Sequence, residues 1–575
     1  MAQSRHRQTT EGILPLILLP LTALLITLPL ILHGCSCGHD FDFHLQSWLD
    51  AAQQLRHGTL YPHWAFSAAY NAGEPRFIFY PPLSWMLGAL ITILFPFSAA
   101  PAIYTWIALT AAGFAMRHLA RQYTSPNAAI LAAALYMANP YMLFNAFERT
   151  AYAELLAAAW IPLLLLAAFR ERPTVRGIAI PVALLWLTNA PAAVMGCYML
   201  AFLGILRLVA SLRASRQAVE PEALQPSRLL LTLTAGTALG LALPAFYLLP
   251  AAFERRYVQI AMAIIPNMRF EDNFLFAHTA DSAHNAVLHT ASLLAVALLL
   301  LTAITVAALF LRTRSKAAPT LAALTLAIAF LLVPISTPLW RHLPDLAFLQ
   351  FPWRLLTILS AVLAFAIALL LPRGENLRNP LLIAAPVCAL ALSLLGITLY
   401  RQPCDDTDTP TAAASLFNTH HGVTPTDEYT PNDADNDVLR SNNPGYWLTT
   451  DPAGFAPNTL PNLGATDPSF ADDLDPEQTI SAQAPQHLVL NLPQPQTLVL
   501  NLRDFPDWRL TRNGSELPSH VERDDGLVAM SLPAGPSTLN ITWKYTLDQK
   551  LGLAITACAL ALLGLTFRRS RKIDD

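Results

Sequence analysis

Charged residues are scarce in this sequence. Lys, Arg, Asp and Glu make up 13% of its 575 residues, whereas a soluble domain has about 25%. This scarcity excludes an ordinary soluble protein. Hydrophobic residues at 54% and a positive mean hydropathy indicate an integral membrane protein instead. The net charge of -3 is uninformative, but no stretch resembles a basic surface for nucleic acid.

Cysteine is also scarce, with six residues in the chain. This number and its scattered spacing exclude a disulfide-rich scaffold. Three cysteines lie within apolar runs, where a small buried thiol is the ordinary interpretation. The three outside such runs are Cys35, Cys37 and Cys404.

Long apolar runs, in contrast, are abundant. A run of about 20 apolar residues can cross a bilayer as a helix, so we predict an α-helical polytopic membrane protein. The first run follows a short basic start without a small-residue cleavage signal, which is typical of an uncleaved anchor. Twelve spans are predicted, at roughly 12–32, 100–117, 127–145, 154–170, 178–190, 191–209, 229–250, 288–311, 318–336, 353–371, 380–400 and 549–567.

The stretch from Tyr80 to Phe97 is apolar too, but it begins Tyr-Pro-Pro and is barely long enough to cross. If it lies along the interface, all basic clusters share one face, as the positive-inside rule requires. If it crosses, the first cluster lies opposite most others. We therefore expect twelve spans in a bacterial inner membrane, both termini in the cytoplasm and the polar loops outside. The basic clusters lie at 5–7, 117–121, 170–176, 213–216, 312–316, 373–378 and 568–572.

The region 401–548 differs in composition from the rest of the chain. From Pro403 to about 470 it is rich in Pro, Asp and Thr, so we expect mostly irregular structure there. Alternating strands and turn signals such as Asn513-Gly514 follow, which predict a β-sandwich from about 475. The predicted domains are a transmembrane domain at 1–400, an extracytoplasmic domain at 401–548, and a last helix with a basic tail at 549–575.

The first outside loop, 33–99, carries Asp40, Asp42 and His44 at the outer end of the first span. Asp40 or Asp42 suits the N-cap of a helix over 45–56, and capping is a sufficient role for either. A partly desolvated carboxylate among aromatic residues also suits general-base work on a hydroxyl. His44 follows Asp40 by four residues, so it either orients that carboxylate or has no role.

Arginines occur in the outside loops against the positive-inside trend. Charges between apolar spans cost free energy unless they are paired or functional. A local Arg149–Glu154 pair and a phosphate-binding Arg149 both fit the sequence. Arg354 lies at the outer end of another span. We expect such arginines to hold an anion, and snorkelling toward lipid headgroups is the alternative.

The cysteine and histidine cluster of the first loop allows a metal site. Cys35, Cys37, His39 and His44 include zinc-type ligands, but their spacing fits no standard pattern. Outside the membrane, either thiol of the Cys-x-Cys pair has Cys404 as a disulfide partner. A separate option is that the Asp-x-Asp pair holds a divalent cation beside phosphate.

The first loop resembles that of the GT-C superfamily of glycosyltransferases. The shared features are an Asp at the end of the first span, a helix, Gly58 and Pro62, and Tyr80-Pro-Pro-Leu-Ser-Trp85. The resemblance extends to lipid A aminoarabinose transferases and protein O-mannosyltransferases, which move sugars from polyprenyl-phosphate carriers. It implies a GT-C-like fold and a membrane glycosyltransferase acting on the extracytoplasmic face.

A bacterial family named "membrane protein, 6-pyruvoyl-tetrahydropterin synthase-related" is more similar still, over roughly 10–400 and more loosely in the sandwich. The family name implies no activity, because pterin synthases are soluble and use a histidine triad that this sequence does not match. The segments that resemble the family are His39-Asp40, Phe43-His44, Gly58–Trp64, Phe77–Leu83, Arg149–Glu154 and Phe351–Arg354.

The resemblance implies direct displacement at the anomeric carbon of a lipid-phosphate sugar. Asp40 is then the base for the acceptor hydroxyl, and Asp42 is the alternative base or a cation ligand. The leaving phosphate is held by Arg149, oriented by Glu154. Further phosphate-binding candidates are Arg76, Arg354 and Tyr80, which occupies the place before Pro-Pro where superfamily members often carry Lys or Glu.

The expected partners are a polyprenyl-phosphate-linked sugar, membrane lipids and a glycan, lipid or protein acceptor, without nucleic acid. A divalent cation is the one cofactor that the residues suggest. The alternative function is a non-catalytic membrane component that binds or assembles lipid-linked glycans, with the sandwich as its working domain.

Overall fold

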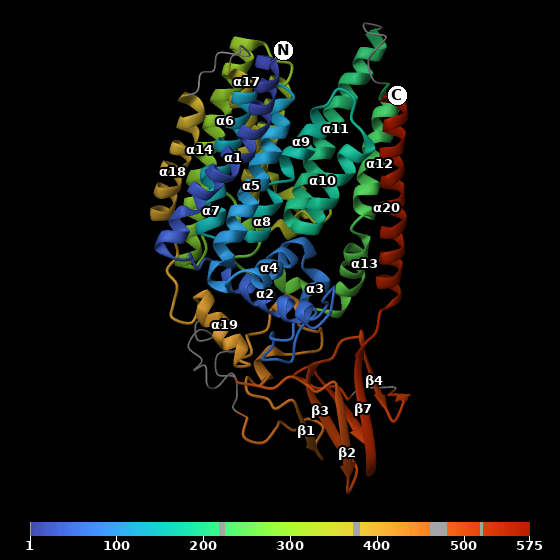
Figure 1. Ribbon diagram of the computed structural model, residues 1–575. Helices are drawn as coiled ribbons and strands as arrows, with labels where there is room; N and C mark the ends of the chain where they lie inside the picture. The colour runs from blue at the N-terminus through green and yellow to red at the C-terminus, as the bar shows by residue number, and fades with distance from the viewer. Residues whose placement is uncertain (1, 218–224, 372–379, 460–479, 518–520, 575) are drawn as a thin grey trace.

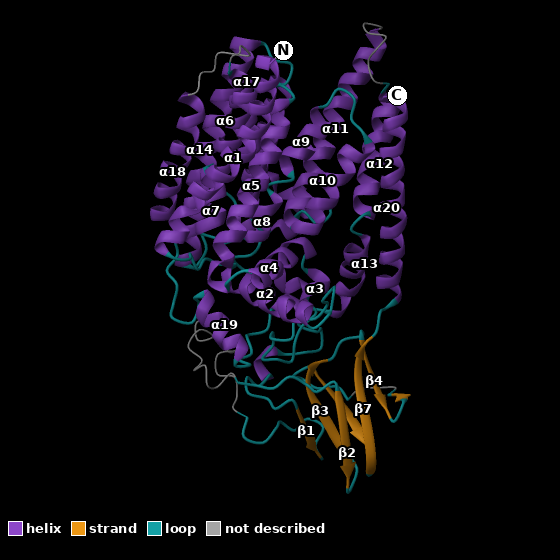
Figure 2. Ribbon diagram, viewed as in Figure 1, coloured by secondary structure: helices purple, strands orange, loops and turns teal. Residues whose placement is uncertain are grey.

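The computed structural model describes residues 2–217, 225–371, 380–459, 480–517 and 521–574. Helices form one long body, and two small sheets lie at one end of it (Figure 1, Figure 2). The first turns of α1 and the last turns of α20 both lie at the opposite end (Figure 1).

The helical body has a helix at each of the twelve predicted apolar runs. Several runs contain two helices separated by a break. In chain order they are α1 (Ala2–His33), α5 (Ala100–Arg121), α6 (Pro126–Met137), α7 (Pro140–Phe147), α8 (Tyr152–Ala157), α9 (Ile161–Phe169), α10 (Val175–Thr188), α11 (Ala190–Gln217), α12 (Pro226–Ala242), α13 (Ala245–Glu254), α14 (Ser282–Thr313), α15 (Ala318–Leu331), α16 (Thr337–His342), α17 (Leu356–Leu370), α18 (Pro380–Tyr400) and α20 (Leu547–Asp574).

Seven helical segments of the described residues are long and apolar enough to cross a membrane, and the number rises to ten if each of three bent pairs is one span. These ten coincide with ten of the twelve predicted spans. The other two predicted spans coincide with the shorter apolar helices α10 and α18. The chain is therefore a mostly helical membrane protein with seven to ten apolar spans, and twelve spans stay a prediction.

The bent pairs have a local cause. At the break between α6 and α7, Pro140 is the first residue of the new helix, and the Asn139 side chain accepts a hydrogen bond from the Tyr141 backbone N–H at 3.0 Å. Proline has no N–H to continue the preceding helix. The axes bend by 40° at this break, by 75° between α12 and α13, and by 92° at the break after α15.

Three short helices of the first loop, α2 (Phe41–Arg56), α3 (Arg76–Phe79) and α4 (Pro82–Leu94), lie between the helical body and the sheets (Figure 1). Helices α2 and α4 approach closely, because a Cβ on Gly88 of α4 would lie 2.2 Å from the Trp48 ring of α2. Helix α19 (Pro410–Asn418) packs against α2 and also against η1 (Phe97–Ala99), which follows α4. Both ends of the 80–97 stretch therefore lie at the sheet end of the molecule.

The two sheets are antiparallel, with strand orders β1-β3-β6 and β2-β7-β4-β5. The predicted turns are present: Asn513 and Gly514 have φ values of 49° and 82° between β4 and β5. One apolar core includes residues from both sheets, such as Leu500 and Met530 from the first and Leu510 and Ile541 from the second. The strands are β1 (Tyr446–Thr449), β2 (His487–Leu492), β3 (Gln496–Arg503), β4 (Trp508–Arg512), β5 (Ser515–Glu516), β6 (Leu527–Leu532) and β7 (Gly535–Trp543).

The apolar core of the sheets also contains Trp64 and Ile78 from the first loop, so the sheets and the first loop are packed together.

The region predicted to be irregular has only short elements within its described part. Its part at 460–470 lies outside the described residues, as does the basic cluster at 373–378. The 3-10 helices are η1, η2 (Arg255–Tyr257), η3 (Ile260–Ile264), η4 (Phe270–Asn273), η5 (Pro334–Ser336), η6 (Ala347–Leu349), η7 (Pro352–Leu355), η8 (Asp427–Tyr429) and η9 (Asn436–Val438).

Candidate active site

Asp40 directly precedes α2 and lies against the loop between α7 and α8. It occupies the N-cap position of α2, but its side chain makes no capping hydrogen bond. The prediction that the Asp40 side chain caps the helix is therefore wrong. Its backbone N–H donates to the carbonyl of Arg149 at 3.0 Å. The side chain is 40% exposed. The carboxylate is thus held by its backbone and is open to a ligand.

Gly38 allows this close approach of the two loops. A Cβ at position 38 would lie 2.0 Å from the backbone carbonyl oxygen of Glu148. Any other residue would push the Asp40 backbone away from the loop that carries Arg149.

Arg149 is buried and lies between two carboxylates. Its Nη1 is 2.6 Å from Oε2 of Glu154, and its Nη2 is 3.8 Å from Oδ2 of Asp40. Burial lowers the pKa of Arg149, but the carboxylates of Glu154 and Asp40 raise it by more, so its pKa is raised overall. The guanidinium therefore keeps its charge. Both alternatives for Arg149 remain consistent with this geometry, because it is paired with Glu154 and also faces Asp40.

Arg354 reaches the same carboxylate from η7. Its Nε lies 3.4 Å from Oε2 of Glu154. The buried Glu154 also accepts hydrogen bonds from the hydroxyl of Tyr141 at 2.8 Å and from Nδ2 of Asn145 at 3.2 Å. Asn145 in turn accepts from Nη1 of Arg149 at 3.0 Å. Glu154 therefore connects two arginines that are far apart in the sequence.

The segment Phe351-Pro-Trp-Arg354 supplies aromatic faces to these arginines. The Arg149 guanidinium lies 4.9 Å from the ring centre of Trp353, and that of Arg354 lies 4.9 Å from the ring centre of Phe351. Such faces attract cations, most strongly when water is excluded. They also keep the guanidinium planes in place.

His44 is buried in α2 below Asp40. Neither ring nitrogen has a hydrogen-bond partner in the described part of the chain, and the ring packs against Tyr152 and Tyr80 with centroid distances of 5.3 and 6.0 Å. Burial lowers the pKa of His44 to about 4, so the ring is neutral at pH 7. It does not orient the Asp40 carboxylate through a hydrogen bond.

Burial is the main cause that raises the pKa of Tyr80, and the Asp40 charge adds to it. Its ring packs against Phe43 with a centroid distance of 4.8 Å. The place before Pro-Pro thus contributes an aromatic ring that packs on Phe43 and His44 of α2.

Asp42 and Arg76 are not part of the cluster around Arg149. Asp42 is exposed, and both residues line a cavity on the neighbouring side of α2. Arg76 is paired with Glu74 at 2.7 Å and donates to Ser47 at 3.0 Å and to Thr426 at 3.2 Å. Its guanidinium is therefore already satisfied by protein groups.

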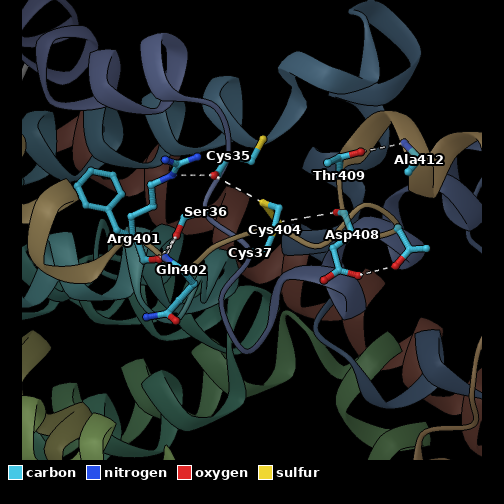
Figure 3. The surroundings of a disulfide bond; sticks show 11 residues. Cys35, Ser36, Cys37, Arg401, Gln402, Cys404, Asp408, Thr409 and Ala412 are labelled. Atoms are coloured by element: carbon cyan, nitrogen blue, oxygen red, sulfur yellow. Dashed lines mark hydrogen bonds between the residues drawn. A yellow bond between two sulfur atoms is a disulfide. The ribbon is translucent and has the colours of Figure 1, made fainter. Parts of the chain in front are cut away.

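The cysteine cluster of the first loop forms a disulfide. Cys37 is bonded to Cys404, and Cys35 is a free thiol beside it (Figure 3). This pairing is one of the two alternatives left open by the sequence, and it contradicts a zinc-thiolate site that includes Cys37. Among the described residues, no group of three or more His, Cys, Asp or Glu side chains could hold a metal ion.

The disulfide joins the first loop to the segment after α18. Next to it, the Ser36 hydroxyl donates to the Phe147 carbonyl and accepts from the Gln402 N–H at 2.9 Å (Figure 3). Gln402 also donates to Glu148 at 2.8 Å. Three separate parts of the sequence are thereby held together beside Asp40.

Sequence reasoning missed Tyr141, Asn145 and Thr357, which surround Glu154. The Thr357 hydroxyl lies 3.4 Å from Oε1 of Glu154. The signal available was the presence of Asn145 among apolar residues, because a buried amide needs a polar partner. The sequence did not show which partner that was.

No family model and no curated protein matches this sequence. Among solved structures, arabinofuranosyltransferase AftD from Mycobacteria is similar over 67% of this chain and 26% of that chain, with 19% identity and a TM-score of 0.39. A mutant of AftD is similar over 66% of this chain and 27% of that chain, with 17% identity and a TM-score of 0.39. The chain spans about a quarter of the length of these structures.

Proposed function

We propose that this chain is a membrane glycosyltransferase of the GT-C type that moves a sugar from a polyprenyl-phosphate carrier to an acceptor hydroxyl. In this proposal Asp40 is the general base, and Arg149 and Arg354 hold the phosphate. The proposal rests on the geometry of these residues and not on the likeness to AftD.

The observation that carries the proposal is the charge balance of the cluster. Two buried guanidinium groups, Arg149 and Arg354, share the single buried carboxylate of Glu154. One positive charge is left over, and among the described residues the other carboxylate in contact is the half-exposed Asp40 at 3.8 Å. A buried surplus cation beside an exposed carboxylate suits an anionic leaving group next to a base.

The reaction is a direct displacement. The acceptor oxygen bonds to the anomeric carbon, the bond from that carbon to the phosphate oxygen breaks, and its electron pair leaves with the phosphate. The hydroxyl proton passes to Asp40. In retaining glycoside hydrolases, a double displacement uses two carboxyl groups of the enzyme that flank the scissile bond, about 5 Å apart. Glu154 is committed to both arginines and does not serve as the second.

The proposed orientation has the sheets, α2 and α19 on the extracytoplasmic face of a bacterial inner membrane and both termini in the cytoplasm, with twelve spans and a C-terminal β-sandwich. It is supported by the common location of the α1 start and the α20 end opposite the sheets (Figure 1). The basic ends of α5 and α14, at Arg121 and Arg312, are consistent with a cytoplasmic face there.

The test is sugar transfer by the full chain in nanodiscs from a panel of synthetic polyprenyl-phosphate pentoses and hexoses. Asp40→Asn is expected to lower the rate by about 10²–10⁴-fold, the usual contribution of a general base. Arg149→Lys is expected to lower it by about 10²-fold, because an ammonium cannot match the planar contacts to Glu154 and Trp353. Asp524→Asn and Arg341→Lys are matched controls on exposed residues.

Wild-type rates in both Asp40→Asn and Arg149→Lys would contradict the proposal. Binding of the lipid-linked sugar without transfer, unchanged in Asp40→Asn, would favour the non-catalytic alternative, a component that binds or assembles lipid-linked glycans.

A further inference from the structure

A cavity of about 960 Å³ lies beside the first turns of α2. Asp42 and Phe43 of α2 form one wall, Met262 and Met268 form a second, and residues between Asp405 and Glu428 form a third. Asp40, Arg149 and Arg354 do not line it. Its volume is at the upper end of the range for small-molecule pockets, about 300–1,000 Å³.

The cavity adjoins the Asp40 cluster at two points. Phe43, three residues after Asp40 and therefore on the same face of the helix, lines the cavity and packs on Tyr80. Gln350 also lines the cavity, and its Oε1 accepts a hydrogen bond from Nη1 of Arg354 at 3.4 Å. Gln350 therefore connects the cavity to the arginine pair, and Phe43 connects it to the first turn of α2, which directly follows Asp40.

The wall between 405 and 428 is acidic. Asp405, Asp408, Asp427 and Glu428 all line the cavity, and none of them makes an ion pair with a residue in the described ranges. Arg76, the arginine among the described residues that line it, is neutralised by Glu74. The cavity therefore has the opposite charge to the arginine pair.

The carboxyl groups suit hydroxyl and ammonium groups. A carboxylate accepts hydrogen bonds from either group, and like charges repel an anion. Burial raises the pKa of Glu428 to about 7, so near neutral pH this group also donates to a ligand oxygen. Met262, Ile265 and Met268 add an apolar side to the cavity, which suits the C–H faces of a sugar ring.

We propose that this cavity binds the acceptor and that the acceptor is a neutral or cationic carbohydrate, with anionic carbohydrates excluded by the acidic wall. The proposal rests on the proposed function, since it names the substrate class of the same reaction. It separates the two substrates by charge: the anionic donor goes to Arg149 and Arg354, and the acceptor goes to the acidic cavity.

The experiment measures binding of three oligosaccharide series of equal length to the full chain in nanodiscs, by calorimetry at low salt and without a donor. The probes are N-acetylated chito-oligosaccharides, which are neutral, their de-N-acetylated cationic forms, and anionic oligogalacturonates. The expected order of affinity is cationic, then neutral, with the anionic series at least about 10-fold weaker than the neutral one.

Two variants locate the binding. Asp405→Asn/Asp408→Asn removes two exposed or half-exposed charges and is expected to lower the cationic affinity about 10-fold while the neutral affinity changes less than threefold. Met268→Trp, at a side chain that is 40% exposed, fills the cavity and is expected to weaken both series. Asp524→Asn, outside the cavity, is expected to bind like the wild type.

Equal or tighter binding of the anionic series would overturn the proposal, and so would no binding by any series or wild-type binding in both cavity variants. Failure of the proposed function is a separate result: the oligosaccharides then bind as expected, but no polyprenyl-phosphate sugar is used. Conversely, sugar transfer at an unchanged acceptor KM in both cavity variants leaves the function and removes this inference.

Discussion

The guanidinium groups of Arg149 and Arg354 share one carboxylate, that of Glu154, although Arg149 lies before α8 and Arg354 lies in η7. Arg149 also lies 3.8 Å from Asp40, and both arginines are held by aromatic faces and by amide groups. Glu154 is therefore the residue on which the proposed phosphate site depends.

Glu154→Gln is expected to lower stability by about 3–5 kcal/mol, because it leaves two buried positive charges without their common partner. Added undecaprenyl phosphate is expected to raise the unfolding midpoint of this variant more than that of the wild type, since an anion replaces the lost charge. Thermal unfolding in detergent measures both effects. Glu522→Gln, at an exposed residue, is the control, and an equal response to the lipid in variant and wild type contradicts the phosphate site.

The Cys37–Cys404 disulfide ties Asp40 to the cavity wall. Cys37 precedes Asp40 by three residues, and Cys404 precedes Asp405 of the wall. Cys37→Ser is expected to destabilise the protein by roughly 2–5 kcal/mol, because the bond closes a long loop. Cys35→Ser is the matched control, with a stability close to the wild type.

Peptide mapping by mass spectrometry checks the pairing directly. Under non-reducing conditions, a Cys37–Cys404 linked peptide and an alkylated Cys35 are expected. A Cys35–Cys404 link would show that the other alternative of the sequence is the correct one.

The stretch between Tyr80 and Phe97 is expected not to cross the membrane, because its two ends contact the same region through α2 and α19. Ser98, which is exposed, tests this by cysteine labelling. A Ser98→Cys variant is expected to react with an impermeant maleimide from outside, whereas Arg121→Cys reacts only after permeabilisation. Reaction of Ser98→Cys only from inside contradicts this arrangement.

Asp507 gives the protein a pH-dependent stability. It is fully buried between the sheets and α20, and its Oδ2 accepts a hydrogen bond from Nε2 of Gln549 at 2.6 Å. Burial and the nearby Asp548 carboxylate raise the pKa of Asp507 to about 7. The folded protein therefore binds more protons here than the unfolded chain between about pH 4 and 7, so this contribution to stability is full below pH 4 and is lost as the pH rises through 7.

Asp507→Asn is expected to weaken this dependence and to raise the unfolding midpoint at pH 8 relative to the wild type. Part of the dependence remains, because the Glu254 carboxyl accepts a hydrogen bond from the same Nε2 of Gln549 at 3.1 Å. Unfolding at pH 5, 6.5 and 8 measures it, with Asp524→Asn as an exposed control. A wild-type pH profile in Asp507→Asn contradicts this assignment.

Much of the helical layout is predictable from sequence, because a run of apolar residues is stable across a bilayer only as a helix. The bends within the runs at Pro140 and Pro334 show as prolines in the sequence. The turn at Asn513-Gly514 was predictable too, since few other residues adopt a positive φ at low cost. The packing of Trp64 and Ile78 into the core of the sheets was not predictable. An apolar side chain in a loop does not show which apolar core it joins.

The sequence by itself determined that this is a helical membrane protein with a C-terminal sheet region, and that Asp40, Arg149, Glu154 and Arg354 lie at the ends of apolar runs. Only the tertiary structure decided that these four meet, that Asp42 and Arg76 belong to a different cavity, and that Cys37 pairs with Cys404. Apolar runs and turn residues act over a few positions of the chain, whereas an ion pair between residues some two hundred positions apart depends on how the helices pack.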